Sequence, residues 1–117
     1  MYRASYAEIV EDDPHEARRR EGAAFDHVIA GLERAEGSGM GADAGLREAA
    51  LDAVHRLWAA LLQDLAHPNN ALPEALRARL IGIGLWIMRD VARLRAGGAG
   101  GFDALIAVNQ TVRAGLR

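Results

Sequence analysis

The chain has 117 residues and no cysteine, so it is long enough for one domain with one core, and disulfides, thiolate nucleophiles and cysteine-based zinc sites are excluded. Its formal net charge of −2 gives no overall attraction to nucleic acid or to an anionic membrane. The longest apolar run, 80–88, is interrupted by two glycines, and the first residues lack the apolar stretch of a signal peptide. We therefore expect a cytoplasmic protein with no membrane span.

The first third of the chain carries apolar residues at helical spacing. Tyr2, Tyr6 and Ile9 fall on one face, which predicts a short N-terminal helix. Asp13 can cap the next helix and Pro14 suits its first position, so a long helix is predicted over about 14–35. Its apolar stripe consists of Ala17, Ala24, Phe25, Val28, Ile29 and Leu32.

The middle of the chain predicts a central helix. Residues 37–41 are rich in glycine, which predicts a flexible linker. A second long helix is predicted over 43–66, and the wide apolar arc around Trp58 favours a largely buried position. Pro68 ends this helix because proline cannot continue the hydrogen-bond ladder.

A third long helix is predicted to start at Leu72-Pro73-Glu74, with an apolar line from Leu76 to Leu94 and Trp86 beside it. Gly82 and Gly84 lie inside it, and each destabilises a helix by about 1 kcal/mol relative to alanine. The two glycines therefore predict either the close approach of another backbone or a local kink.

The last segment predicts one more short helix. Glycines within 97–101 predict a second flexible linker, and Asp103 is expected to cap a helix after it. No window alternates long enough to predict strands, and no internal repeat is present. The whole pattern predicts one all-α domain over 1–117, an antiparallel bundle of three long helices with short N- and C-terminal helices.

Patterns typical of catalysis and of metal binding are missing. No two of the four histidines are three or four residues apart, as a helical metal site would need. The two serines lie in a terminal segment and in a glycine-rich linker, where nothing would hold a nucleophile in place. Neither glycine cluster is followed by the Lys-Ser/Thr of a P-loop. We expect no enzyme activity, no cofactor and no metal.

Two features leave alternatives open. The cluster 18–20 is basic, but acidic residues share its helix, so a solvated face with ion pairs is favoured over a nucleic-acid patch. Trp58 and Trp86 can each bury a large area, which suits either a core or a groove for a partner helix. At least one of them is expected in the core.

One ordered set of residues spans the chain and consists of Met1-Tyr2, Tyr6, Leu57-Trp58, Asp64-Leu65, Asn70-Ala71-Leu72-Pro73, Leu76-Arg77, Leu80, Trp86, Leu105 to Asn109 and Gly115-Leu116. In order and spacing this set resembles the FlaF family, flagellar biosynthesis regulators of alphaproteobacteria. One departure is His55-Arg56, where family members commonly carry Asn-Arg before the Leu-Trp pair.

The resemblance implies a cytoplasmic factor that binds flagellin as a chaperone or export adaptor and promotes its synthesis and secretion. The alternative is a post-transcriptional regulator of flagellin mRNA that acts with FlbT or on RNA; a purely structural subunit has no feature in its favour. Flagellin's terminal amphipathic helices are the expected ligand, because an extensive apolar arc can accept a helix. We expect the last helix to sit loosely in a groove between the two tryptophan-bearing helices, or to form one wall of it.

Individual residues receive roles within that hypothesis. Asn70 is expected to form the turn before Pro73, Asp64 and Arg77 to pair across it, and Asn109 to bond to a partner or a facing helix. The motif expected to be structural comprises Asp64, Asn70, Leu72, Pro73, Leu76 and Arg77. The candidate partner-binding residues are Tyr2, Tyr6, Trp58, Trp86, Ile106, Asn109, Val112 and Leu116.

Overall fold

A computed structural model describes residues 14–37 and 44–115, which form four α-helices. These are α2 (Pro14–Gly37), α3 (Ala44–Ala66), α4 (Glu74–Arg95) and α5 (Asp103–Ala114). The described ranges contain no strand, so the predicted all-α class is confirmed. The predicted N-terminal helix and most of the linker predicted at 37–41 lie outside the described residues, and α2 includes Gly37.

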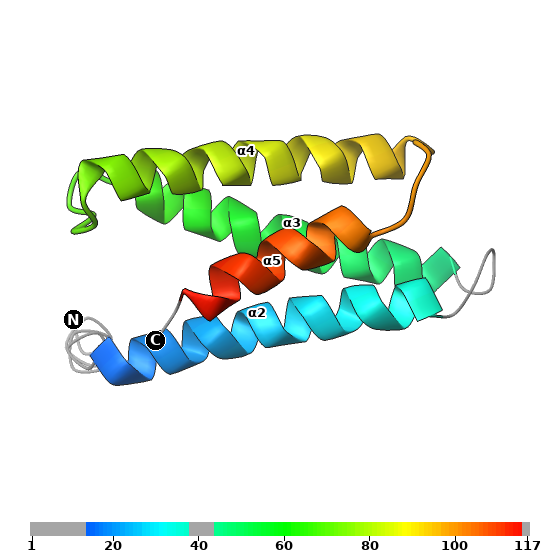
Figure 1. Cartoon of the computed structure of the whole chain (residues 1–117), viewed down its shortest axis with the longest axis horizontal. Helices are drawn as coiled ribbons and strands as arrows, with labels where there is room; N and C mark the ends of the chain where they lie inside the picture. Colours follow the sequence, from blue (N-terminus) through cyan, green and yellow to red (C-terminus); the bar gives the residue numbers. More distant parts are fainter. Residues whose placement is uncertain (1–13, 38–43, 116–117) are drawn as a thin grey trace, which may run out of the picture.

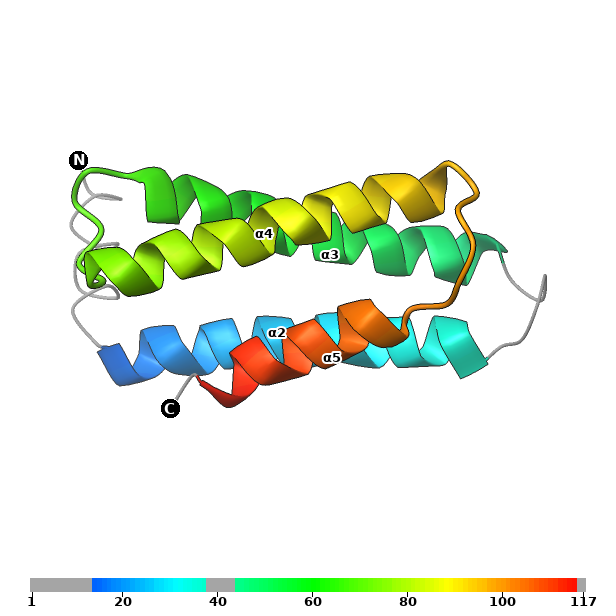
Figure 2. The same cartoon turned by 45° about the horizontal axis from the view of Figure 1, so that its top comes forward.

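Helix α3 is the central element of the fold (Figure 1). It packs against α2 on one side and α4 on the other, while α5 lies along α2. Figure 2 shows α3 and α4 in one layer, and α2 and α5 in the other. Successive helices run in roughly opposite directions, so the start of α3 lies near the C-terminal ends of α2 and α4, and its end lies near their N-terminal ends.

One hydrophobic core joins all four helices. Trp58 is 1% exposed, and the Phe25 ring meets it edge to face with 5.9 Å between ring centroids. The predicted stripe of α2 faces this core, since Phe25, Val28 and Leu32 are buried. The other buried members are Ala50, Leu51, Val54, Ile87, Val91, Leu94, Phe102 and Leu105.

The chain leaves α4 through a Schellman motif. Gly97 has a φ of 89°, which an L side chain rarely adopts, and its N–H donates to the Leu94 carbonyl. The Gly98 N–H donates to the Arg93 carbonyl at 2.9 Å. These bonds satisfy carbonyls that the helix end would leave unpaired, and they turn the chain toward α5.

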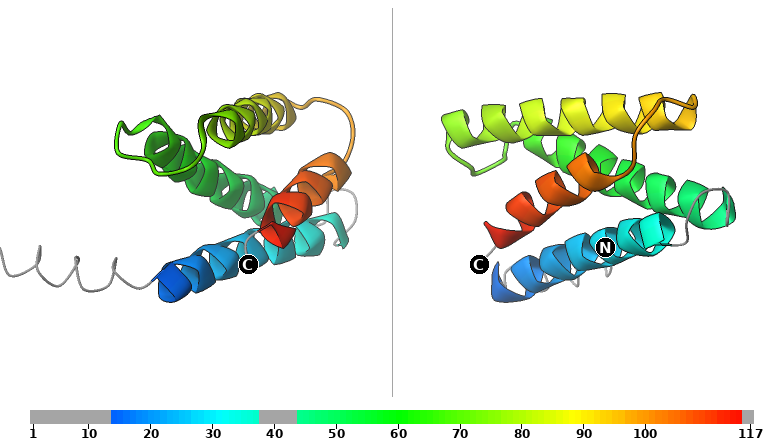
Figure 3. Two further views of the ribbon diagram at one scale, coloured as in Figure 1. Left: turned by 60° about the vertical axis from the view of Figure 1, so that its left-hand side comes forward. Right: turned by 45° about the vertical axis from the view of Figure 1, so that its right-hand side comes forward.

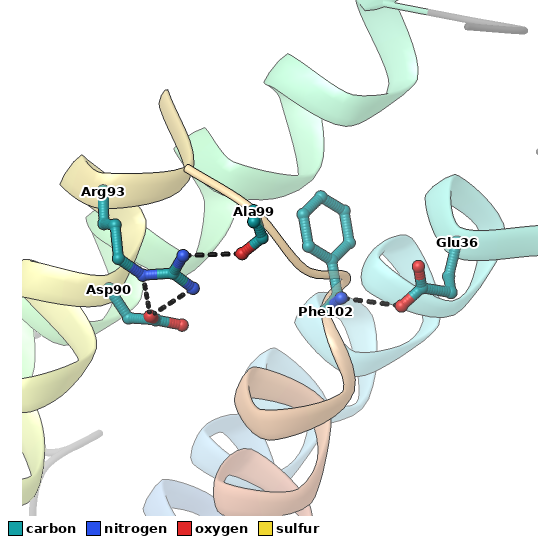
Figure 4. A network of polar contacts seen from close by, with 5 residues as sticks. All are labelled: Glu36, Asp90, Arg93, Ala99 and Phe102. Atoms are coloured by element: carbon teal, nitrogen blue, oxygen red, sulfur yellow. Dashed lines mark hydrogen bonds and ion pairs between the residues drawn. The ribbon is translucent and has the colours of Figure 1, made fainter. Parts of the chain in front are cut away.

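The segment between α4 and α5 is fixed at both ends by side chains (Figure 4). Arg93 bonds to Asp90 with its Nε and to the Ala99 carbonyl with its Nη1 at 2.6 Å. At the other end, the Phe102 N–H donates to Glu36 Oε1 at 2.6 Å. The segment predicted to be a flexible linker is therefore held by contacts to both layers.

Helix α5 begins without a side-chain cap. Phe102 occupies the N-cap position and Asp103 is the first helical residue, so the predicted capping role of Asp103 is wrong. Phe102 is there because its ring is 1% exposed, with the Arg47 guanidinium carbon 4.8 Å from the ring centroid. Burial of an aromatic ring outweighs a cap contribution of about 1 kcal/mol, and Glu36 accepts a hydrogen bond from the N–H of Phe102 itself.

We expect Glu36→Ala to destabilise the protein. The variant removes a charged acceptor from the part-buried Phe102 N–H, so the loss should be about 1–2 kcal/mol. Urea denaturation would measure it, with Glu33→Ala, an exposed position on the same helix, as the control. Equal losses of stability in the two variants would contradict a stabilising hydrogen bond between Glu36 and the Phe102 N–H.

Candidate protein-binding surface

A buried hydrogen bond fixes α5 on the core. The Trp58 Nε1–H donates to Asn109 Oδ1 at 2.8 Å, and Asn109 Nδ2 donates to the Leu105 carbonyl at 2.8 Å. Asn109 and Leu105 are both fully buried. A buried indole N–H without a partner would carry a large desolvation penalty, so this bond selects one register of α5 on α3.

Helix α5 is also tied at its C-terminal end. The Arg113 guanidinium lies over Gly22 of α2, and its Nε donates to Asp26 Oδ1 at 3.0 Å. With Glu36 at the other end of α5, both ends of the helix are bonded to α2. The expectation that the last helix sits loosely is therefore wrong for this structure.

Burial along α4 declines toward its N-terminal end. Leu94, Val91 and Ile87 are at most 2% exposed. Ile83 and Leu80 are half-buried, and the exposure then rises to 40% at Leu76 and 39% at Leu72. The residues from Leu76 to Leu94 follow one helical line, and Leu72 precedes the N-cap residue Pro73, so a single apolar stripe is buried at one end of α4 and exposed at the other.

The length and direction of α5 account for this gradient. Helix α5 is ten residues shorter than α4, which is about 15 Å at the rise of an α-helix. It starts near the C-terminal end of α4 and runs away from it toward α2 (Figures 1 and 3). Among the described residues, no further helix lies on this side of the first turns of α4, and we name Leu72, Leu76, Leu80 and Ile83 the uncovered stripe.

Polar and aromatic groups border the uncovered stripe. Trp86 is half-buried and packs against the core, next to Ile83 on the helix surface. Arg79 is exposed and lies between Leu76 and Ile83 on the same side. An exposed apolar strip with an aromatic and a cationic neighbour makes this surface the candidate site for binding another protein.

Asn70 holds the turn that places the start of the stripe. Its Oδ1 accepts from the Leu72 N–H at 3.1 Å, and its Nδ2 donates to the Asp64 carbonyl at 3.0 Å. The same Nδ2 lies 3.4 Å from Asp64 Oδ2. Asn70 thus forms the turn, and Pro73 takes the N-cap position of α4 without a side-chain cap bond.

The expected ion pair between Asp64 and Arg77 is not formed. Among the described residues Asp64 accepts from Asn70, and the Arg77 N–H makes the first backbone bond of α4, to the Pro73 carbonyl. The angle between α3 and α4 therefore depends on the amide of Asn70, and the expected role of Arg77 is corrected.

The α2–α3 contact brings two carboxylates together near the same end. Partial burial of Glu21, and then the charge of Asp64, raise the pKa of Glu21 above its ordinary value of 4.5. Ionised Glu21 is therefore destabilising in the folded state.

The other sequence-predicted residues are distributed over the molecule. Trp58 and Asn109 are buried against each other, which agrees with the expectation that one tryptophan lies in the core and that Asn109 bonds to a facing helix, and their contact with a partner stays a prediction. Ile106 and Val112 are half-buried and pack against the core from α5. The remaining candidates, Tyr2, Tyr6 and Leu116, lie outside the described residues.

The described ranges contain neither a metal-binding cluster nor a helix suited to a membrane. Over 14–37 and 44–115, no three His, Asp or Glu side chains are grouped so that they could hold a metal ion. None of the four helices combines the length and the apolar character that a membrane crossing requires.

Comparison with known proteins decides the family. The family model described as flagellar protein FlaF matches residues 2–116, nearly the whole chain. The chain belongs to the FlaF family. No curated protein and no solved structure matches it. A flagellar role is therefore established for this FlaF protein at the level of its family.

We expect the Trp58–Asn109 bond to show energetic coupling. In this FlaF chain, Asn109→Leu leaves the indole N–H unpaired in the core and should destabilise by about 1–3 kcal/mol. Trp58→Phe together with Asn109→Leu removes both partners, so the double variant should lose less than the sum of the two singles. Urea denaturation of the four proteins measures the cycle, and strictly additive losses would contradict the coupling.

We expect Glu21→Gln to raise the melting temperature near neutral pH. The pKa of Glu21 is higher in the folded state, so the unfolded chain loses the proton first and ionisation opposes folding. The advantage of the variant should be present above the raised pKa and vanish as the pH falls below 4.5, where both states are protonated. Thermal melts at several pH values test this, with Glu33→Gln as control. A constant difference between variant and wild type would contradict it.

Proposed function

We propose that this FlaF protein is a cytoplasmic binding protein for flagellin, not an enzyme, and that it acts as a chaperone or export adaptor in flagellin synthesis and secretion. The family match supports a flagellar role. The observation that carries the finer proposal is the uncovered stripe, an apolar line that continues from the core onto the surface.

The ligand of the uncovered stripe is a terminal amphipathic helix of flagellin. Such a helix presents apolar residues at i, i+3, i+4 and i+7, and it can continue the packing that buries the other half of the α4 stripe. Leu72 and Leu76 then become buried, and Trp86 extends the contact along the helix. Arg79 beside the stripe pairs with a carboxylate of the bound helix.

The fold of the free protein does not depend on this contact. The core runs through Trp58, Ile87 and Leu105, all of which are at most 1% exposed without a partner. Binding at the uncovered stripe therefore leaves α5 in place. This differs from a mechanism in which flagellin displaces α5, which would expose Trp58.

We expect Leu72→Ser with Leu76→Ser to weaken flagellin binding at least about tenfold without unfolding the protein. Both side chains are about two-fifths exposed, so their loss affects the partner more than the core. Calorimetric titration with monomeric flagellin measures the affinity, and circular dichroism checks the fold. Leu46→Ser is the matched control, because Leu46 is 37% exposed at the start of α3, near the other end of α4.

The same proteins separate binding of flagellin from binding of its message. Titration with flagellin leader RNA at two salt concentrations would show affinity falling steeply with salt if RNA contacts were direct. We expect no such binding, since Arg19 of the basic cluster is already paired with Glu16. Unchanged flagellin affinity in the double serine variant, or tight salt-dependent RNA binding, would overturn the proposal.

A further inference from the structure

The outer face of α4 is a second apolar surface, separate from the uncovered stripe. Helix α4 lies at the edge of the molecule, with α3 on its inner side (Figures 1 and 3). The residues of its outer face recur at helical spacing. They are Glu74, Ala78, Ile81, Gly82, Leu85 and Arg89. Leu85 is 48% exposed, more than any other large hydrophobic side chain among the described residues.

No packing contact among the described residues explains the glycine at position 82. A Cβ at Gly84 would lie 2.7 Å from Leu62 Cδ2, so Gly84 permits close packing of α4 on α3. A Cβ at Gly82 would meet nothing within 4 Å. A glycine inside a helix is destabilising relative to alanine, so its benefit at this position has to come from a contact with another molecule.

We propose that the outer face of α4 pairs with the same face of a second copy of this chain, in antiparallel orientation about a two-fold axis between Ile81 and Gly82. A two-fold interface needs a surface that is complementary to itself. About this axis Gly82 of one copy lies opposite Ile81 of the other, and Ala78 lies opposite Leu85. Each large side chain thus meets a small one, which lets the two helices approach closely.

The charges of α4 fit the same arrangement. The axis that pairs Ala78 with Leu85 also places Glu74 of one copy opposite Arg89 of the other, so two ion pairs close the ends of the contact. Both residues are exposed, and neither has an ion-pair partner among the residues that the structure describes. A parallel pairing would instead bring like residues together.

The size of the contact sets its strength. The face from Glu74 to Arg89 is about 22 Å long, and one helix pair of that length buries less than a standard interface of about 800 Å² per partner. The dimer is therefore weak, and its population rises with protein concentration. The uncovered stripe is on a different side of α4, so both contacts can form at once.

Charge reversal tests the pairing and its orientation in the full-length protein. Sedimentation velocity over a concentration series should show a monomer–dimer equilibrium for the wild type. Glu74→Arg and Arg89→Glu should each weaken association, and the double variant should restore it, because the two pairs then re-form with exchanged signs. Circular dichroism controls for the fold, since Glu74 also lies in the first turn of α4.

Gly82→Ala is expected to change stability and dimerisation in opposite directions, which separates a role of Gly82 in the interface from a role in the fold. The variant should raise the melting temperature by several degrees, because alanine favours the helix and the added Cβ meets nothing in the monomer. It should also weaken dimerisation, because that Cβ lies at the crossing point. Leu85→Arg should weaken dimerisation most, at least about tenfold.

Three results would overturn the proposal. A wild type that is monomeric at every concentration would exclude self-association, and changes of flagellin affinity in the outer-face variants would then assign this face to flagellin. Failure of the double charge reversal to restore association would exclude the antiparallel pairing. A Gly82→Ala variant that dimerises as well as the wild type would exclude the close crossing.

Discussion

The buried indole of Trp58 is the constraint on which the arrangement of the helices depends. Its ring fills the space between α2, α3 and α4, and its N–H has to find an acceptor there because water does not reach it. Asn109 is the acceptor, and its own amide N–H is satisfied by the Leu105 carbonyl. Only one position of α5 provides this pair of bonds, so a polar contact sets the geometry of an apolar core.

That fixed position determines which surfaces remain open. The C-terminal half of the α4 stripe is buried in one cluster with Phe102 and Leu105, whereas α5 itself lies along α2 and the other half of the stripe is partly exposed. The open part is not a packing defect, since the described residues contain no buried side-chain polar atom without a partner and the core is complete. Helix α4 therefore has a buried segment that belongs to the fold and an exposed segment available to a partner.

The helices could be predicted from the sequence, while the contacts between them could not. Apolar periodicity, Pro68 and the glycines near 97–101 placed α2, α3, α4 and α5 within a few residues, because these signals act locally. Asn109 stood out as polar on an apolar face, but its bond spans 51 positions, so periodicity could not choose between a partner and Trp58. Aspartate is a common cap residue, so the sequence favours Asp103 as the cap. The burial of Phe102, which places Phe102 at that position, depends on tertiary contacts that local patterns do not reveal.

The two glycines of α4 show how a local signal becomes informative only with the structure. In the sequence Gly82 and Gly84 are equivalent, and both weaken the helix by about 1 kcal/mol relative to alanine. The structure separates them, because Gly84 faces Leu62 and Trp58 whereas Gly82 faces solvent. The destabilisation at Gly84 is offset by tight packing on α3. At Gly82 nothing in the monomer offsets it, and a destabilising residue on an exposed face beside Leu85 indicates a contact that forms only between molecules.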